Sequence, residues 1–445
     1  MPEPVLLVDP PVADLDDHLA RGGGAGLARA RSLGPGATIQ EVILSGLRGR
    51  GGGGFPTGRK WQSVRDAAAA GGGGGAERTF VVCNGAEGEP ATFKDRALIR
   101  ANPYAVVEGV AIAAFAVGAE GAYIGTKASF GPESERLATA VDEMTAAGLI
   151  GDVPVRVVLG PDDYLFGEET GLLQVIEGEA PLPRLVPPYI EGLFATVPGS
   201  GWTPPVEGVR PDELAASNPT VVNNVETLAT VTQVLARGPE WHRSLGTERS
   251  PGVVVATVVG DVVRPGVGEV ELGTPLREVI DRVGGGVTPG RTIKAVLPGV
   301  ANPVIPGDAL DAPCSYEGLE AIGSGMGAAG FWVLDDTTSI IEVAQAVSRF
   351  LAVESCGQCP ACKLGCTAVT EGLDRLMAAA ATPEDVEVMA YRLRTVTDGN
   401  RCYLPVQEQR VIGSVLATYV DEINDALDGT PPPTRGLEVP KIVDL

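Results

Sequence analysis

The sequence is poor in histidine, in basic residues and in long apolar runs. Only two histidines, His18 and His242, occur in 445 residues, which argues against histidine-based catalysis and a histidine-rich metal site. Acidic residues outnumber basic ones by 57 to 34, a net charge of -23, so a nucleic-acid backbone would be repelled and no nucleic-acid partner is expected. The longest apolar stretch, residues 105–119, is interrupted by Glu108 and is shorter than the ~18 residues of a membrane span, so no direct membrane insertion is expected.

The N-terminus and the cysteine content bear on the cellular compartment. Residues 1–19 carry acids where an export signal would carry bases, so we expect a cytoplasmic protein. Four of the seven cysteines crowd into residues 356–366. Without an export signal, such crowding indicates metal binding rather than a disulfide framework.

The length and the order of apolar patterns predict several domains. A chain of 445 residues exceeds one ordinary core, so two or three domains are expected. After an N-terminal extension at residues 1–37, the region 38–245 alternates short strands and helices, as in a layered α/β domain. Its first helix is expected to begin at the capping-box sequence Thr38-Ile39-Gln40-Glu41. Further helices are expected at 104–117 and 133–147, and strands at 80–83, 122–124 and 155–159.

The second half of the chain has a different pattern. Residues 250–310 predict a small β-grasp module, with strands at 253–259 and 295–297 and a helix at 272–283. Residues 335–428 are predicted to be helical, and the Pro-rich tail 429–445 to be extended. Within the α/β domain, residues 195–217 are rich in Pro and Gly and predict a long surface loop.

Glycine is abundant, at 60 residues, and one glycine run stands among cations and aromatic residues. The runs at 22–24 and 71–75 have the composition of flexible linkers. Residues 49–61 read G-R-G-G-G-G-F-P-T-G-R-K-W and follow a predicted helix. Consecutive glycines allow a close approach of the backbone to a ligand, and their amides can cradle a phosphate beside Arg50 and Lys60. A flexible loop is the alternative interpretation of the glycines alone.

This stretch resembles one in the NADH-oxidising flavoprotein of respiratory complex I, its F-type subunit. The same type of subunit is the diaphorase part of NAD-reducing hydrogenases and formate dehydrogenases. In that family the pattern G-R-G-G-x-G-F-P-x-G-x-K-W lies against flavin mononucleotide (FMN) and NADH. Three further segments, at 84–96, 164–173 and 219–227, are similar to N-x-D-E-x-E-P-G-T-x-K-D-R, G-E-E-T-A-L-L and P-T-x-x-N-N-V-E-T of the family.

The resemblance implies a set of binding residues, and no side chain that acts as a catalytic acid, base or nucleophile. For FMN these residues are Gly49, Arg50, Gly52, Lys60, Asn84, Glu87, Gly167, Glu168, Glu169, Asn223, Asn224 and Thr227. For NADH they are Phe55, Glu89, Glu169 and Tyr189. On residue content alone, the acidic loop could be a solvated surface loop, Glu168 and Glu169 a helix start, and the Asn pair a turn or cap.

Several positions depart from the family pattern. Ala86 replaces a common Asp beside the flavin, Ser63 an aromatic residue that helps to hold the adenine, and Val186 a usual Lys. Residues 195–217 are an insertion relative to the family. These departures weaken the expected adenine contacts more than the flavin site.

The most specific signal is the spacing C-x2-C-x2-C at Cys356, Cys359 and Cys362. Thiolates at this spacing can hold three corners of a [4Fe–4S] cluster, whereas zinc usually pairs two separate C-x2-C knuckles. Cys366 would complete a ferredoxin-like run, whose last Cys serves a second cluster that has no other ligands here. The resemblance favours Cys402 as the fourth ligand, because the family has a distant fourth cysteine.

The resemblance covers about residues 38–427 and implies a function. We expect an FMN domain that oxidises NADH and a helical [4Fe–4S] domain that passes single electrons to a partner. A thioredoxin-like [2Fe–2S] subunit and further iron–sulfur subunits of a larger complex are the expected partners, and the complex could attach peripherally to the inner face of a membrane. The alternatives are a flavin and iron–sulfur subunit with another donor or acceptor, and a degenerate structural subunit.

Overall fold

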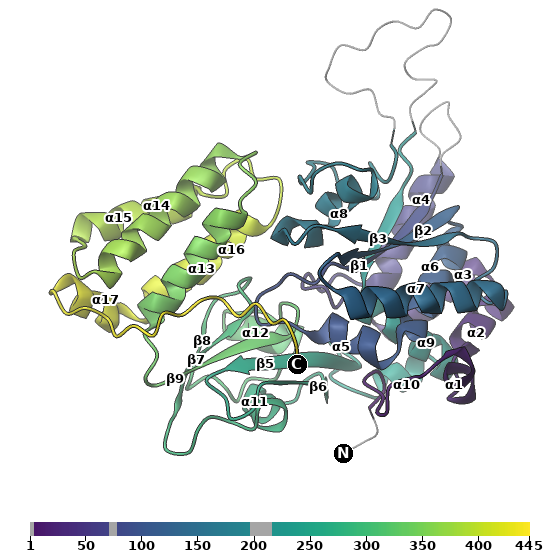
Figure 1. The fold of residues 1–445 in the computed structure, drawn as a ribbon, viewed down its shortest axis with the longest axis horizontal. Helices are drawn as coiled ribbons and strands as arrows, with labels where there is room; N and C mark the ends of the chain where they lie inside the picture. The colour runs from purple at the N-terminus through teal and green to yellow at the C-terminus, as the bar shows by residue number, and fades with distance from the viewer. Residues whose placement is uncertain (1–3, 71–77, 196–215) are drawn as a thin grey trace, which may run out of the picture. The chain divides into compact units, whose positions relative to one another are not determined.

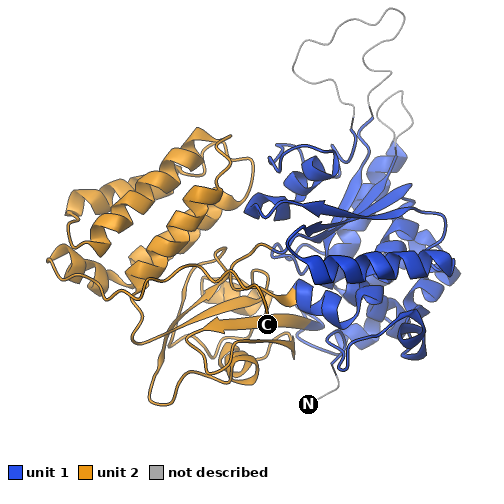
Figure 2. Cartoon of the chain, viewed as in Figure 1, with its two compact units in different colours: residues 1–87, 95–253 blue, residues 88–94, 254–445 orange. Residues whose placement is uncertain are grey.

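The computed structural model describes residues 4–70, 78–195 and 216–445. These residues form two compact units (Figure 2), and each is described by itself below. Unit 1 comprises residues 1–87 and 95–253, and unit 2 comprises residues 88–94 and 254–445. Segment 88–94 therefore belongs to unit 2 although both of its flanks belong to unit 1. The linkers at 71–75 and most of the insertion at 195–217 lie outside the described residues.

Unit 1 contains a four-stranded sheet in the order β3-β2-β1-β4, of which Figure 1 labels β1, β2 and β3. The strands are β1 (Phe80–Gly85), β2 (Gly121–Lys127), β3 (Val155–Gly160) and β4 (Thr220–Asn224). Every neighbouring pair is parallel, and Phe80 of β1 stands opposite Gly121 of β2 and Thr220 of β4. The burial of β1 on both faces fits a parallel sheet covered by helices.

Helices of unit 1 cover this sheet. Figure 1 shows α7 (Gly131–Ala146) and α8 (Glu169–Ile176) on opposite sides of it. The central helix α6 (Pro103–Val117) is buried along almost its whole length, because its sequence is apolar on every face. The remaining helical elements are α1 (Leu15–Ala20), α2 (Ala25–Leu33), α3 (Pro35–Ser45), α4 (Thr57–Ala70), α5 (Lys94–Ala101), η1 (Tyr164–Gly167), α9 (Val225–Arg237) and α10 (Pro239–Arg243).

The N-terminal segment is built into unit 1. Helix α2 packs against α6 and α9. The one acid of α6, Glu108, accepts hydrogen bonds from the amides of Gly24 and Leu27 at 2.9 Å each, and lies 3.3 Å from His18 Nε2. The segment predicted as an extension therefore supplies α1 and α2, and two amides at the start of α2 satisfy a buried carboxylate.

The predicted helix start at Thr38 is wrong. Helix α3 begins at Pro35, whose fixed φ suits the first helical turn, and Gly34 is its N-cap. Thr38 lies inside the helix, where its Oγ1 donates to the carbonyl oxygens of Gly34 at 2.9 Å and Ala30 at 3.1 Å. A hydroxyl that bonds back along its own helix cannot cap the next turn.

Unit 2 begins with a five-stranded sheet in the order β6-β5-β9-β7-β8. Its strands are β5 (Val253–Gly260), β6 (Gly266–Glu271), β7 (Ile293–Pro298), β8 (Ile305–Pro306) and β9 (Gly330–Asp335), with helices α11 (Leu276–Gly284) and α12 (Tyr316–Ala321). Strand β9 pairs parallel with β5 and antiparallel with β7. The sheet thus takes a central strand from beyond residue 310, where the predicted module ended. Helix α11 starts four residues later than Leu272 because Pro275 is its N-cap.

The rest of unit 2 is helical, as predicted. The helices are α13 (Ile340–Glu354), α14 (Pro360–Met377), α15 (Pro383–Thr395), α16 (Leu404–Thr418) and α17 (Val420–Leu427). Helix α13 packs against α14 and α16, and α15 packs against the same two helices. Residues 429–445 contain no helix or strand and form an extended tail, as predicted.

No single helix among the described residues is long and apolar enough to cross a membrane. Helices α5 and α6 pass that test only as a pair bent by 101°.

Candidate functional site

Three segments of unit 1 that were predicted to bind FMN lie at the ends of its parallel strands or next to them. Asn84 stands at the end of β1, and Asn223 and Asn224 stand at the end of β4, its neighbour in the sheet. The carboxyl ends of parallel strands are where open α/β sheets bind ligands. The glycine loop adjoins this edge, because a Cβ added to Gly51 would lie 3.1 Å from the Cβ of Asn224.

The glycine loop connects α3 to α4 and is pinned at its base. The amide of Gly49 donates to Phe55 O at 2.9 Å, and Arg48 Nε donates to Gly54 O at 2.8 Å. Gly52 and Gly54 have φ values of 108° and 59°, which L side chains rarely adopt. Within the described parts of the chain, no acceptor takes the amides of Gly51 to Gly54. These N–H groups can receive the oxygens of a phosphate, so the loop fits a nucleotide.

Arg50 does not lie open to a phosphate. Its side chain is buried, and Nη2 donates to Val253 O at 2.9 Å and to Pro251 O at 3.3 Å. Nε lies 3.9 Å from Glu226 Oε1, and the Arg50 amide donates to Thr227 Oγ1 at 2.8 Å. Arg50 therefore ties the glycine loop to α9 and to the last residues of unit 1. Thr227, predicted as a flavin contact, holds the same loop by accepting the hydrogen bond from the Arg50 amide.

Lys60, unlike Arg50, remains partly open. Its Nζ pairs with Glu169 and also donates to Val222 O of β4 at 3.1 Å. The side chains of Lys60 and Glu169 are 23% and 45% exposed, so a ligand could reach both. The structure thus brings together two predicted binding residues that lie 109 positions apart.

The three predicted asparagines have different environments. Asn84 Nδ2 donates to Gly167 O at 2.8 Å, which joins β1 to the η1 turn. Asn223 Oδ1 accepts from Trp61 Nε1 at 2.7 Å, so the indole is buried and its face is not offered to a ring. Asn224 is the N-cap of α9, and its Nδ2 donates to Asp95 at 2.6 Å. Asp95 is a member of this site that sequence reasoning did not single out, although it stands in the matched K-D-R pattern.

Two predicted acids hold helix starts. Glu87 accepts hydrogen bonds from the Asp95 amide and from Arg96 Nε at 3.0 Å each, at the first turn of α5. Glu168 is the N-cap of α8, and its Oε2 accepts from the amides of Thr170 and Gly171 at 2.9 and 2.8 Å. Burial raises the pKa of Glu168, although the hydrogen bonds from Thr170 and Gly171 oppose that shift. The helix-start interpretation of Glu168 therefore describes its contacts in the free chain.

Glu89 lies in segment 88–94 and is held by unit 2. Its Oε1 accepts from the Val300 amide at 2.7 Å, just after strand β7. The predicted NADH contacts Phe55 and Tyr189 are 54% and 46% exposed. Ala86 is buried with Phe166 and Leu172, so a small apolar side chain fills the position of the missing acid. Ser63 is exposed, and its Oγ donates to Arg59 O within α4.

The four predicted cluster cysteines lie around the start of two packed helices. Cys359 is the N-cap of α14, Cys362 lies in its first turn, and Cys402 stands two residues before α16. Among the described residues, no three His, Cys, Asp or Glu side chains converge on a single metal ion. A cubane needs no such convergence, because each thiolate binds a different iron. The four thiols fit the chemistry of a [4Fe–4S] cluster, and all are free of disulfides.

Cys362 and Cys366 have opposite acid–base properties. A hydrogen bond from the Cys366 thiol lowers the pKa of Cys362 to about 7, against the effect of burial. Ser355 Oγ, 3.3 Å from Cys362 Sγ, and the charge of Lys363 also favour this thiolate. The same hydrogen bond, together with burial and the nearby Glu408, raises the pKa of Cys366. The protonated thiol is therefore favoured at Cys366 and the thiolate at Cys362.

A buried acid that the sequence did not reveal lies behind these cysteines. Glu408 of α16 is 0% exposed, and its Oε1 accepts from Ser348 Oγ at 2.7 Å. Within the described residues, its Oε2 has no hydrogen-bond partner. Burial raises the pKa of Glu408 to about 8. No local motif could have identified it, because only the bundle packing makes it interior.

An amide-lined glycine loop at the carboxyl edge of a parallel sheet, with a thiol-rich helical region in the same chain, defines the class: a modular protein with the features of a nucleotide-binding domain and of an iron–sulfur domain. Three family models match the chain. The Nuo51 FMN-binding domain matches residues 42–233, the SLBB domain residues 255–298, and the NADH-ubiquinone oxidoreductase-F iron-sulfur binding region residues 342–426.

The relatives agree with these matches. An F-type subunit of NADH-quinone oxidoreductase from Rhizobium meliloti is 36% identical over 418 residues, which cover 90% of this chain and 92% of the relative. The F-type subunit of NADH-quinone oxidoreductase from Streptomyces coelicolor is 34% identical over 426 residues, which cover 93% of this chain and 88% of the relative. The chain belongs to the family of F-type subunits of NADH-quinone oxidoreductase. The predicted family, fold class and cofactors are thereby confirmed.

A solved structure has the same fold. It is the NAD+-reducing [NiFe]-hydrogenase in its H2-reduced state, with a TM-score of 0.78 and 29% identity. The similarity covers 91% of this chain but 64% of the hydrogenase chain, so this chain spans somewhat less than two thirds of that protein. The assignment of each cofactor contact to a residue stays a prediction.

Proposed function

We propose that this chain is the electron-input subunit of a larger oxidoreductase complex, in which it oxidises NADH with FMN and passes single electrons on through a [4Fe–4S] cluster. The observation that carries the proposal is the amide-lined loop at Gly51 to Gly54, beside the strand ends that bear Asn84 and Asn224. Relatives that align over 90% or more of this chain are named as NADH-quinone oxidoreductase subunits. When bound, FMN and the cluster supply the exchange between a two-electron donor and one-electron acceptors.

The side chains of unit 1 bind and orient in this proposal. The free amides of the glycine loop hold the flavin phosphate, since a net charge of -23 cannot attract it from a distance. Lys60 and Glu169 form an ion pair, and together they offer a hydrogen-bond donor and an acceptor to a polar ring. Phe55 and Tyr189 expose aromatic faces for the dinucleotide.

The site belongs to one subunit among several. The relatives are named as subunits, which supports iron–sulfur partner proteins in a common complex. A thioredoxin-like [2Fe–2S] subunit is the partner that we propose to receive or share the electrons. Peripheral attachment to the cytoplasmic face of a membrane would then be a property of that complex.

The proposal is tested by purifying the chain without oxygen and measuring NADH-dependent reduction of ferricyanide. We expect a coloured protein with one FMN per chain, a cubane spin signal after reduction, and turnover with NADH. Turnover only with a donor other than NADH would favour the alternative, a flavin and iron–sulfur subunit that uses a different electron donor. A protein that binds neither FMN nor iron would instead be a structural subunit, and the proposal would be wrong.

A further inference from the structure

The extended tail of unit 2 is fastened at several separate polar points. We define the C-terminal strap as residues 431–441. Glu342 in the first turn of α13 is 2% exposed, and its Oε1 accepts from Thr434 Oγ1 at 2.7 Å and from the Gly436 amide at 2.7 Å. The same carboxylate accepts from the amides of Arg435 and Leu437 at 2.9 and 3.1 Å. Successive strap amides thus form a concave nest around one buried anion.

The acid–base state of Glu342 agrees with this anchor. Burial would raise the pKa of its carboxyl. Hydrogen bonds from Thr434 and from three strap amides outweigh burial and lower the pKa. The carboxylate is therefore charged at neutral pH, and charge-assisted hydrogen bonds are stronger than neutral ones.

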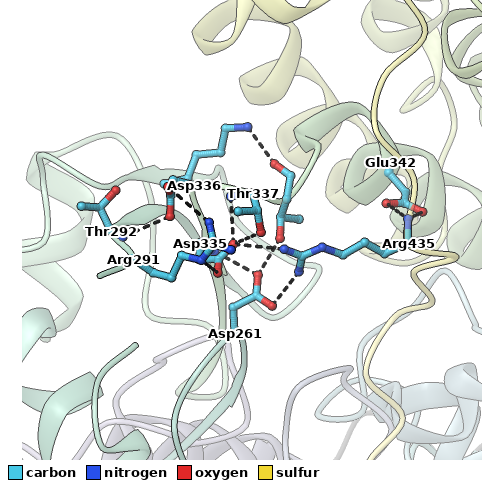
Figure 3. Close-up of polar contacts among 10 residues, drawn as sticks. Asp261, Arg291, Thr292, Asp335, Asp336, Thr337, Glu342 and Arg435 are labelled. Carbon is cyan, nitrogen blue, oxygen red and sulfur yellow. Dashed lines mark hydrogen bonds and ion pairs between the residues drawn. The ribbon is translucent and has the colours of Figure 1, made fainter. Parts of the chain in front are cut away.

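The side chain of Arg435 fastens the strap to the sheet (Figure 3). Its Nη1 lies 2.9 Å from Asp261 Oδ1 and its Nη2 lies 3.2 Å from Asp335 Oδ1. Asp261 follows β5 and Asp335 ends β9, and Asp261 Oδ2 accepts from the Asp335 amide at 3.0 Å. The strap consequently joins helix α13 to two central strands of unit 2.

The far end of the strap reaches segment 88–94. The carbonyl of Pro440 accepts a hydrogen bond from the Ala91 amide at 2.9 Å. Ala91 has a φ of 64°, a left-handed conformation that is costly for a residue with a side chain and persists only where the surroundings hold it. Two residues earlier in the chain stands Glu89, whose carboxylate accepts from the Val300 amide.

The strap is not simply packed against the helices. A groove of about 990 Å³ opens between the strap and helices α13 and α14. Lys441 Nζ lies 3.7 Å from Glu354 and 5.4 Å from the Phe350 ring centroid, near the end of α13.

We propose that the C-terminal strap is a positioning element for segment 88–94, and that Glu342 and Arg435 hold the strap so that it fixes the backbone next to Glu89. The functional part rests on the proposed function, because Glu89 is a predicted NADH contact. Glu342 and Arg435 act through the strap and touch no reacting group.

Two variants release the strap in different ways. Glu342→Gln removes the charge of the anchor, and a chain ended after Val439 removes the Pro440 carbonyl while it keeps the anchor. Glu438→Gln is the matched control, because it makes the same Glu-to-Gln change at an exposed residue of the strap. The shortened chain loses no fully buried residue and should fold if Glu342→Gln does not.

The first measurement is amide hydrogen exchange of the FMN- and cluster-loaded chain without NADH. We expect exchange at Ala91 to accelerate by about tenfold or more in both variants, as the loss of a hydrogen-bond partner allows. The control should match the parent chain. Unchanged exchange at Ala91 in the shortened chain would overturn the proposal, whatever the chain oxidises.

The second measurement separates positioning from general stability. We expect KM for NADH to rise several-fold in the shortened chain with a smaller change in kcat. In a Glu89→Gln background the same shortening should change KM no further, because the strap acts through Glu89. Independent effects in the two backgrounds would overturn the positioning role. A parent chain without NADH turnover would refute the proposed function and leave the exchange result to decide whether the strap holds the segment.

Discussion

Arg50 and Glu226 form a charged pair in the interior of unit 1. Their side chains are 1% and 0% exposed, and Arg50 also bonds two backbone carbonyls near the end of the unit. A buried charge that loses its partner is strongly destabilising, more so than the pair is stabilising. The arginine of the glycine loop therefore ties that loop to the interior of unit 1.

We predict that Arg50→Met lowers the free energy of unfolding by about 3–5 kcal/mol, because it leaves the carboxylate beside it without its buried cation. Glu226→Gln should also destabilise, and the double variant should lose less than the sum of the two single losses. Denaturant unfolding of the four proteins measures this coupling. Additive losses would mean that the two side chains do not interact.

Two cysteines with different environments, Cys366 and Cys402, are candidates for the fourth cluster ligand. Cys366 is fully buried and donates a hydrogen bond toward Cys362, whereas Cys402 is half-buried just before α16. We predict that Cys402→Ser abolishes the visible absorption and spin signal of the cluster, while Cys366→Ser keeps both. Anaerobic spectroscopy of the two proteins gives the answer, and the opposite pattern would transfer the ligand role to Cys366.

At this scale the sequence predicts which residues gather, but not which way they point. The motifs placed Lys60 and Glu169 in one predicted site, and the two side chains do pair in the structure. They could not show that Arg50 points inward, because inward or outward direction depends on the packing of α9 and of Pro251 to Val253. Glu408 was missed for the same reason.

The glycine loop between α3 and α4 shows how an element can require glycine at some positions and tolerate other residues at others. Gly52 has a positive φ of 108°, whereas Gly53 is outside that region and a Cβ added to it would meet nothing within 4 Å. Of these two positions, only Gly52 therefore needs the freedom of glycine to keep the loop conformation.

We predict that Gly52→Ala weakens FMN binding by roughly 5- to 150-fold, because the alanine strains or reshapes the cradle by roughly 1–3 kcal/mol. Gly53→Ala should keep the loop conformation and bind FMN more tightly than the Gly52 variant. Flavin fluorescence on titration into the flavin-free chain measures both affinities. Equal losses would mean that space around the flavin, and not backbone conformation, controls the binding.

Whole elements were predicted best where a strong apolar pattern lies between clear stops. Helix α6 was expected at 104–117 and spans Pro103–Val117, since Asn102 and Gly118 delimit it. The β-grasp sheet was incomplete in the prediction because β9 comes far along the chain and joins β5 by a non-local pairing. Such a pairing leaves no local signal in the sequence.

At the scale of the molecule, two buried groups give the two units opposite responses to pH. In unit 1, burial lowers the pKa of His242 to about 4, against a hydrogen bond to Ser45 O. In unit 2, burial raises the pKa of Glu408 to about 8. The folded chain thus keeps His242 neutral and Glu408 protonated at pH values where the unfolded chain would not.

The sign of each effect follows from proton uptake. Below the ordinary pKa of histidine, His242 is protonated in the unfolded chain but stays neutral in the folded chain. Unit 1 therefore loses stability as pH falls from about 6.5 toward 4. Above the ordinary pKa of a carboxyl the unfolded chain releases a proton that Glu408 retains, so unit 2 loses stability as pH rises from about 4.5 toward 8.

We therefore predict that Glu408→Gln stabilises the cofactor-loaded chain at pH 7 to 8 and removes a slope that approaches about 1.4 kcal/mol per pH unit. His242→Asn should remove the loss of unfolding free energy between about pH 6.5 and 4, and should leave the unfolding free energy near pH 7 unchanged. Denaturant unfolding across the pH range measures both, with Glu438→Gln as an exposed control. A Glu408→Gln chain whose stability keeps the parent's decline toward pH 8 would show that this carboxyl already ionises in the folded protein, and that the bundle behind the cysteines admits water or a counter-charge.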